Sequence, residues 1–169
     1  GGIIGAIITT IPALLQYKWR ANVLVSSLMM NYVCLYLGLF LLFHHFKDPA
    51  SSQHSYPIGS AAALTPLIPG TKIHSGLILA AVVTFFSWLL LYRTKTGYSL
   101  RAAGQNPTFA KYAGLSVGSL AVVSQLIGGF IGGMGGAVQM LGLFSRFQWI
   151  ELLGFGWDGV TVAIFAKNN

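Results

Sequence analysis

Three long stretches of the sequence contain no Asp, Glu, Lys or Arg: residues 22–43, 75–92 and 115–143. A helix of about 20 apolar residues is long enough to cross the hydrocarbon core of a membrane. Charged residues make up only 8% of the chain, against roughly 25% in an ordinary soluble domain, and they are too few to cover a water-exposed surface. The sequence therefore predicts an all-α integral membrane protein, a polytopic helical bundle.

Two further apolar stretches are shorter or interrupted. Residues 1–15 are apolar but too few to span, and residues 150–166 are mostly apolar but include Glu151, Asp158 and several glycines. We expect a partial span from the first and a partial or re-entrant segment from the second, all within one transmembrane domain over 1–169. Because both ends of the sequence adjoin apolar stretches, we expect the functional protein to be longer.

Basic residues gather on one side of this predicted topology. Seven of the ten Lys and Arg residues fall on the side that holds the loop 93–114, and three fall on the side that holds the loop 44–74. The excess of basic residues in cytoplasmic loops assigns 93–114 to the cytoplasm and 44–74 to the outside. The net charge of +7 then suits an anionic lipid surface, and nucleic-acid binding is not expected.

Residues for enzymatic or metal chemistry are sparse. His44 and His45 are adjacent, which is the wrong spacing for a pair of ligands on one helix face, so we expect solvated or interfacial histidines and no metal site. The three acids, Asp48, Glu151 and Asp158, do not form a catalytic pair. No catalytic residue and no cofactor is therefore expected.

The cytoplasmic loop 93–114 contains signals for a short helix. Asn106 is suited to cap the free amides of a helix start, and Pro107 suits its first turn. Gly114 supplies a stop signal. The pattern predicts an amphipathic helix over 107–113 that lies flat at the membrane surface.

A cluster of glycines lies in the last long apolar stretch. Its overlapping GxxxG spacings allow the backbones of two helices to approach closely, and the density of glycine also predicts a bend or a break in the helix. The glycines expected to pack are Gly128, Gly129, Gly132, Gly133 and Gly136.

Residues 154–159, GFGWDG, match the letters of a dinucleotide-binding motif without its context, because no soluble strand precedes them and no acidic residue follows at the required distance. We expect instead that the glycines interrupt a helix and that Asp158 caps the next one. An acid at membrane depth is also often functional.

Three sequence blocks resemble known permease motifs. The segment SSLMMNY at 26–32 is similar to STLMLNY in nucleoside and simple-sugar ABC permeases, and TGYSLRAAGQNP at 96–107 is similar to their TxxGyxLRAvGxNP signature. The segments GFGWDGVTVA at 154–163 and KNN at 167–169 resemble GyGfDGIAVAL and GrNNP. Departures such as Ala103 for Val, Thr161 for Ala and Ala166 for Gly are mild, and the blocks follow the order of the family.

The resemblance is to the permease subunits of bacterial ABC importers, in the branched-chain amino acid/ribose-type family and its nucleoside and simple-sugar branch. Such permeases pair in the inner membrane, take solute from an extracytoplasmic binding protein and depend on a cytoplasmic ATPase. No phosphate-binding GxxxxGK[ST] occurs in this chain, so ATP hydrolysis is expected on a separate subunit. The loop 93–114 would contact the ATPase through Arg101, Gly104, Asn106, Pro107, Ala110, Lys111 and Gly114.

Solute contacts are expected from polar and aromatic side chains within the apolar stretches, each of which has a packing role as its alternative. These residues are Asn31, Gln125, Gln139, Phe155, Trp157 and Asp158. An ion-coupled secondary transporter or channel stays open as the alternative function, because broken glycine-rich helices and a membrane-embedded acid also fit that class.

Overall fold

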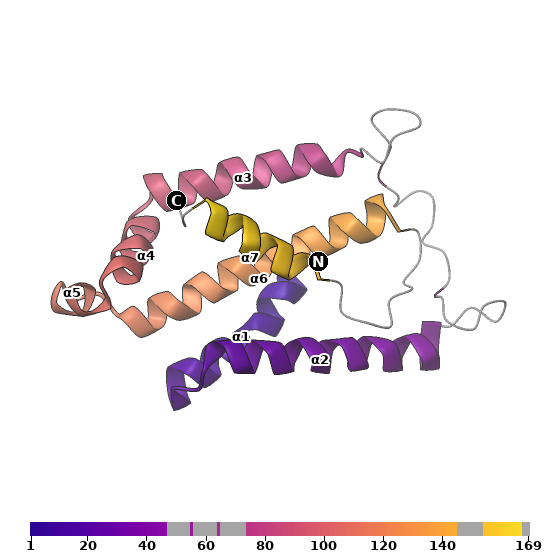
Figure 1. Ribbon diagram of the computed structural model, residues 1–169, viewed down its shortest axis with the longest axis horizontal. Coiled ribbons are helices and arrows are strands. Elements are labelled where there is room, and N and C mark those ends of the chain that lie inside the picture. Colours follow the sequence, from indigo (N-terminus) through magenta and orange to yellow (C-terminus); the bar gives the residue numbers. More distant parts are fainter. Residues whose placement is uncertain (47–54, 56–63, 65–73, 145–153, 167–169) are drawn as a thin grey trace. The chain divides into compact units, whose positions relative to one another are not determined.

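The computed structural model describes residues 1–46, 55, 64, 74–144 and 154–166, and these residues contain no β-strand. Its helices are α1 (Gly2–Trp19), α2 (Val23–Leu41), the π-helical turn η1 (Leu42–Phe46), α3 (Gly76–Arg93), α4 (Lys95–Gln105), α5 (Pro107–Tyr112), α6 (Val117–Gly142) and α7 (Phe155–Phe165) (Figure 1). The all-α class predicted from the sequence is confirmed.

Three of the helical segments are long and apolar enough to cross a membrane: Val23–His45, Gly76–Arg93 and Val117–Gly142. They coincide with the three charge-free stretches, which confirms the expected bundle of three full spans with further short segments. At 1.5 Å per residue, α6 is about 39 Å long. It exceeds a hydrocarbon core of about 30 Å, so it must tilt or extend beyond the core.

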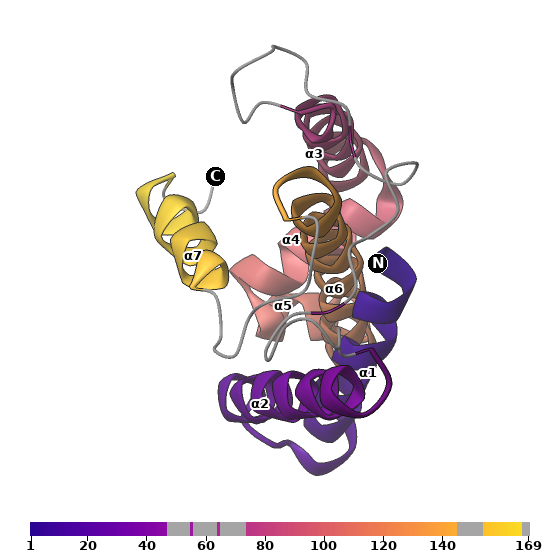
Figure 2. The ribbon, with the colours of Figure 1, turned by 90° about the vertical axis from the view of Figure 1, so that its right-hand side faces the viewer.

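The chain divides into two compact units, residues 1–30 with 57–146 and residues 31–56 with 147–169. In the first unit, α1 packs beside α6 (Figure 2). The two helices run antiparallel, because Gly1 lies near Gly133 and Tyr17 lies near Gly118. The consecutive helices α4 and α5, joined at Asn106 and together called the hairpin below, lie at the end of the unit where α3 finishes and α6 begins (Figure 1). In the second unit, α7 and the later part of α2 are apolar helices without a buried residue.

The described residues enclose only a small interior. The buried apolar side chains among them are Ala13, Leu42, Ala103 and Ala110, whereas many large apolar side chains are exposed on the spanning helices. A helix that is apolar on all sides needs lipid or protein around it. The exposed apolar surface is therefore the one that a bilayer and further helices would cover.

Two sequence predictions about helix breaks are wrong. Helix α6 runs unbroken from Val117 to Gly142, through the whole glycine cluster, because its packing against α1 offsets the low helix propensity of glycine. Helix α7 begins at Phe155 with Gly154 as its N-cap residue, so Asp158 lies in the first turn and is not the cap. A carboxylate there still interacts favourably with the helix dipole.

One helix was missed from the sequence. Helix α4, Lys95–Gln105, occupies the first half of the loop that was expected to contain only one short helix. The predicted outer loop 44–74 and the start of the segment 150–166 fall mostly outside the described residues.

Candidate functional site

A single residue joins α3 to α4. Thr94 is both the C-cap of α3 and the N-cap of α4. Its hydroxyl donates to the Leu90 carbonyl at 2.6 Å and accepts from the Gly97 amide at 3.1 Å. These two bonds satisfy one free group at each helix terminus, so the turn between the helices has a defined geometry.

Gly97 allows α4 to approach the last turn of α3 closely. A Cβ built at Gly97 would meet the carbonyl oxygens of Leu90 and Leu91 and would lie 2.6 Å from the Leu91 Cα. These are backbone atoms, which cannot rotate away as a side chain can. Only glycine fits at this position without moving α4 away from α3.

Arg101 adds a contact between the same two helices. Its guanidinium carbon lies 4.6 Å from the centre of the Tyr92 ring, within the range of a cation–π interaction. On the same helix, Gly104 is exposed, and no described atom outside the helix backbone lies within 4 Å of a Cβ built there. Gly104 therefore presents a smooth surface on α4.

The helix predicted from Asn106, Pro107 and Gly114 is confirmed as α5. The Asn106 side-chain oxygen accepts the Phe109 amide at 2.9 Å, and Pro107 occupies the first turn. After the helix, Gly114 has φ = 80°, a left-handed conformation that glycine adopts without strain. Local capping and backbone geometry therefore define both ends of α5.

The exposed surface of α5 combines aromatic and basic side chains. Phe109 is 61% exposed and Tyr112 is 89% exposed, and Lys111 lies between them in sequence. Ala110 is fully buried, so it supports the hairpin from within and cannot itself be a contact residue. Sequence reasoning missed Phe109 and Tyr112, although their spacing of three residues already places them on one side of a helix.

The glycines of α6 fall into two groups. A Cβ at Gly129 would meet Thr9 and would lie 2.8 Å from the Gly5 carbonyl oxygen, and one at Gly133 would lie 2.6 Å from the Gly1 carbonyl oxygen. These two glycines allow the backbones of α1 and α6 to come together. At Gly128, Gly132 and Gly136, by contrast, no described atom beyond the helix lies within 4 Å of a built Cβ.

Gln125 contacts the same neighbouring helix through its side chain. Its Nε2 donates to the Oε1 of Gln16 on α1 at 2.7 Å, in a partly buried position. Sequence reasoning had named Gln125 without finding Gln16, because the two are far apart in the chain. The hydrogen bond joins α1 to α6. It also gives each of the two side-chain amides a partner, and an amide left without a partner at membrane depth would cost free energy.

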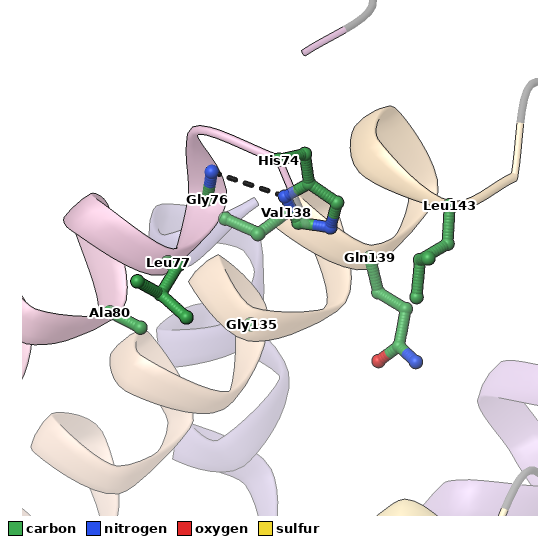
Figure 3. Close-up of a pocket in the computed structure, with 8 residues that line it drawn as sticks. All are labelled: His74, Gly76, Leu77, Ala80, Gly135, Val138, Gln139 and Leu143. Atoms are coloured by element: carbon green, nitrogen blue, oxygen red, sulfur yellow. Dashed lines mark hydrogen bonds between the residues drawn. The ribbon is translucent and has the colours of Figure 1, made fainter. Parts of the chain in front are cut away.

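Gln139 lies on the same side of α6 as Gln125, because fourteen residues make nearly four helical turns. The open glycines Gly128 and Gly132 lie between the two glutamines on that side. Gln139 also lines a pocket between α6 and the start of α3 (Figure 3). This side of α6 therefore carries two amides separated by small residues.

The other expected solute-contact residues belong to the second unit. Asn31 is exposed on α2, and Phe155, Trp157 and Asp158 are exposed along the first turn of α7. Among the described residues, no group of three or more His, Cys, Asp or Glu side chains could hold a metal ion.

The comparisons with known proteins place this chain in a transport family. The family described as "Branched-chain amino acid transport system / permease component" matches residues 1–169. No solved structure matches the chain.

Several curated relatives are named as ABC transporter permeases. The guanosine ABC transporter permease protein of Bacillus subtilis is 27% identical over 94% of this chain and 47% of its own length. A nucleoside ABC transporter permease protein of Lactococcus lactis is 29% identical over 100% of this chain and 55% of its own length. The glucose ABC transporter permease protein of Haloferax volcanii is 26% identical over 99% of this chain and 47% of its own length.

The chain thus spans about half the length of the curated relatives it matches. The match to the family nevertheless covers every residue, and it confirms the resemblance carried by the three sequence blocks. This chain belongs to the family of branched-chain amino acid transport system permease components.

Proposed function

We propose that this chain is the membrane-spanning permease part of an ATP-driven importer for nucleosides or simple sugars. It works by alternating access in the inner membrane of a bacterium, and the ATPase is a separate cytoplasmic subunit. A second permease subunit, identical or related, completes the pathway, and an extracytoplasmic binding protein delivers the solute. The support for the solute class comes from relatives that are named for guanosine, nucleosides and glucose.

The observation that carries the proposal is the hairpin of α4 and α5. Thr94, Gly97 and Arg101 fix α4 against α3, while Asn106 fixes the start of α5. Because these contacts hold α4 and α5 in a defined position, a force on α5 moves the neighbouring helices and does not only deform the hairpin. Movement of a bound ATPase against α5 would therefore pass directly into α3, and into α6 through the short connection after Gly114.

The exposed side chains of α5 suit a protein partner. Exposed aromatic residues are enriched at the centre of protein interfaces, and Phe109 and Tyr112 provide them. Lys111 adds a positive charge of the kind that steers a partner with negative charge. The basic residues of the hairpin also agree with a cytoplasmic location. In the proposal, the other residues expected to couple to the ATPase act by setting the conformation and position of α4 and α5. They are Arg101, Gly104, Asn106, Pro107, Ala110 and Gly114.

The glutamine side of α6 is the proposed wall of the solute path. Gln139 offers amide donors and an acceptor to an uncharged solute, and Gln125 offers only the amide groups that its bond to Gln16 does not use. Gly128 and Gly132 leave room beside the helix between them. Asn31, Phe155, Trp157 and Asp158 are proposed as further contacts from the second unit.

The proposal is tested by substitutions on α5. In the whole importer, Tyr112→Ala and Lys111→Glu are expected to lower co-purification of the ATPase with the permease and to lower ATP-dependent uptake together. The matched controls are Tyr36→Ala, an exposed tyrosine on α2, and Lys95→Glu at the start of α4.

Two results would contradict the proposal. One is ATPase association and uptake that both survive the α5 substitutions unchanged. The other is uptake that follows an ion gradient and does not require ATP, which would favour a secondary transporter.

A further inference from the structure

A pocket of about 370 Å³ lies in the first unit, between the start of α3 and the end of α6. Leu77 and Ala80 line it from α3, Gly135 and Val138 line it from α6, and His74 and Gln139 provide its polar side chains (Figure 3). The start of α3 and the end of α6 lie at the opposite end of the unit from α4 and α5 (Figure 1), and the pocket between them therefore does too. In the proposed topology this is the extracytoplasmic end, where solute arrives.

His74 is held in a defined orientation at this pocket. Its Nδ1 accepts the amide of Gly76 at 3.1 Å (Figure 3). Its ring packs closely against Gly76 on α3 and Gly142 on α6, where a Cβ would collide with it. Because Nδ1 accepts a hydrogen bond, the neutral imidazole carries its proton on Nε2, so His74 can donate a hydrogen bond from the side turned away from Gly76.

Gln139 complements this donor with both kinds of hydrogen-bonding group. Its carboxamide provides one acceptor and two donors, and no described residue forms a hydrogen bond with its side chain. The rest of the wall is aliphatic or glycine, and no charged side chain lines the described part of the pocket. Such a lining penalises a charged ligand, which would lose hydration without finding a counter-charge.

We infer that this pocket is an entry subsite for a small uncharged solute that has an apolar face and hydrogen-bonding groups at its edge. His74 and Gln139 contact the polar edge, and Leu77, Ala80 and Val138 contact the apolar face. A nucleoside base and the carbon face of a sugar share this chemistry. The inference rests on the proposed import function and adds the place where solute first meets the permease.

The experiment uses neighbouring alanines of α3. Ala80 lines the pocket and Ala81 does not, and both are accessible in the described structure. In the whole importer, with Cys34 and any other cysteine replaced, Ala80→Cys and Ala81→Cys are treated with a small water-soluble thiol reagent. Guanosine, uridine or glucose is present or absent.

The thiol reagent is expected to label the Ala80→Cys variant, and a solute that the importer transports is expected to lower that labelling rate at least threefold. The same solute should leave the labelling rate of the Ala81→Cys variant unchanged. Protection by guanosine and uridine assigns the pocket to a nucleoside, and protection by glucose assigns it to a sugar. Equal labelling of the Ala80→Cys variant with and without each of the three solutes overturns the inference.

A second measurement separates hydrogen bonding from shape. Gln139→Leu, made in the Ala80→Cys variant, removes the amide at nearly constant size. It is expected to raise the solute concentration that gives half-maximal protection by about two- to tenfold, which corresponds to the loss of one or two hydrogen bonds. Unchanged protection in this variant would remove Gln139 from the subsite. A wild-type importer that shows no ATP-dependent uptake, with solute protection still present, would contradict the proposed function and leave the binding pocket standing.

Discussion

Substitution of Gly97 by alanine tests whether close packing of α4 on α3 holds the hairpin in place. The added Cβ would lie 2.6 Å from the Leu91 Cα and closer still to two carbonyl oxygens, whereas carbon atoms in contact are about 3.5–4.0 Å apart. The helix would have to move by about 1 Å, which is overpacking against backbone and costs about 1–3 kcal/mol. The undocked hairpin should become about 5- to 150-fold more populated.

The matched control is Gly104→Ala on the same helix. A Cβ at Gly104 meets no described atom within 4 Å, so alanine should keep the hairpin docked and stabilise α4 by up to about 1 kcal/mol through its helix propensity. The two variants make the same chemical change and are expected to have effects of opposite sign.

The assay is limited trypsin digestion of inside-out membrane vesicles, with cleavage followed after Lys95 and Arg101. When opening is fast relative to cleavage, the rate follows the population of the open form. Cleavage should be about 5- to 150-fold faster in Gly97→Ala and unchanged or slower in Gly104→Ala. Equal cleavage rates in Gly97→Ala and the wild type would refute the packing argument.

Three further predictions concern other contacts of the first unit. Asn106→Ala removes the cap of α5 and should destabilise that helix by about 0.5–2 kcal/mol, whereas Asn106→Asp should retain the cap; trypsin cleavage of the hairpin compares them. Gln125→Leu breaks the 2.7 Å bond to Gln16 and should cost about 0.6–1.7 kcal/mol, visible as a lower Tm in detergent. Gly129→Ala should lower the Tm because it collides with α1, whereas Gly132→Ala, which meets no described neighbour, should leave the Tm unchanged or raise it through the helix propensity of alanine; equal shifts would contradict the assigned α1–α6 contact.

The sequence predicted those features that depend on local chemistry. The three spans follow from runs of apolar residues, and α5 follows from Asn106, Pro107 and Gly114, which act within a few residues of their own positions. Each of these signals reports a local preference, and the structure agrees with each of them.

Features that depend on contacts between residues far apart in the chain could not be predicted from local sequence patterns. Helix α4 is polar and contains Gly97 and Gly104, so its local signal is weak; its packing on α3 stabilises it. Helix α6 continues through its glycines because α1 packs against Gly129 and Gly133. The Gln16–Gln125 bond and the His74 pocket likewise join residues that lie far apart in the chain.

The central claim, that α5 is the element that contacts the ATPase, is tested most directly by crosslinking. A single cysteine is placed by Thr108→Cys, at an exposed position of α5 that keeps Tyr112 and Lys111, or by Ser75→Cys at the opposite end of α3, in the whole importer with its other cysteines replaced. A short cysteine-to-lysine crosslinker should join the Thr108→Cys permease to the ATPase and should leave the Ser75→Cys permease unjoined. An ATPase crosslink from Ser75→Cys, or none from Thr108→Cys in an importer that still transports, would contradict the account.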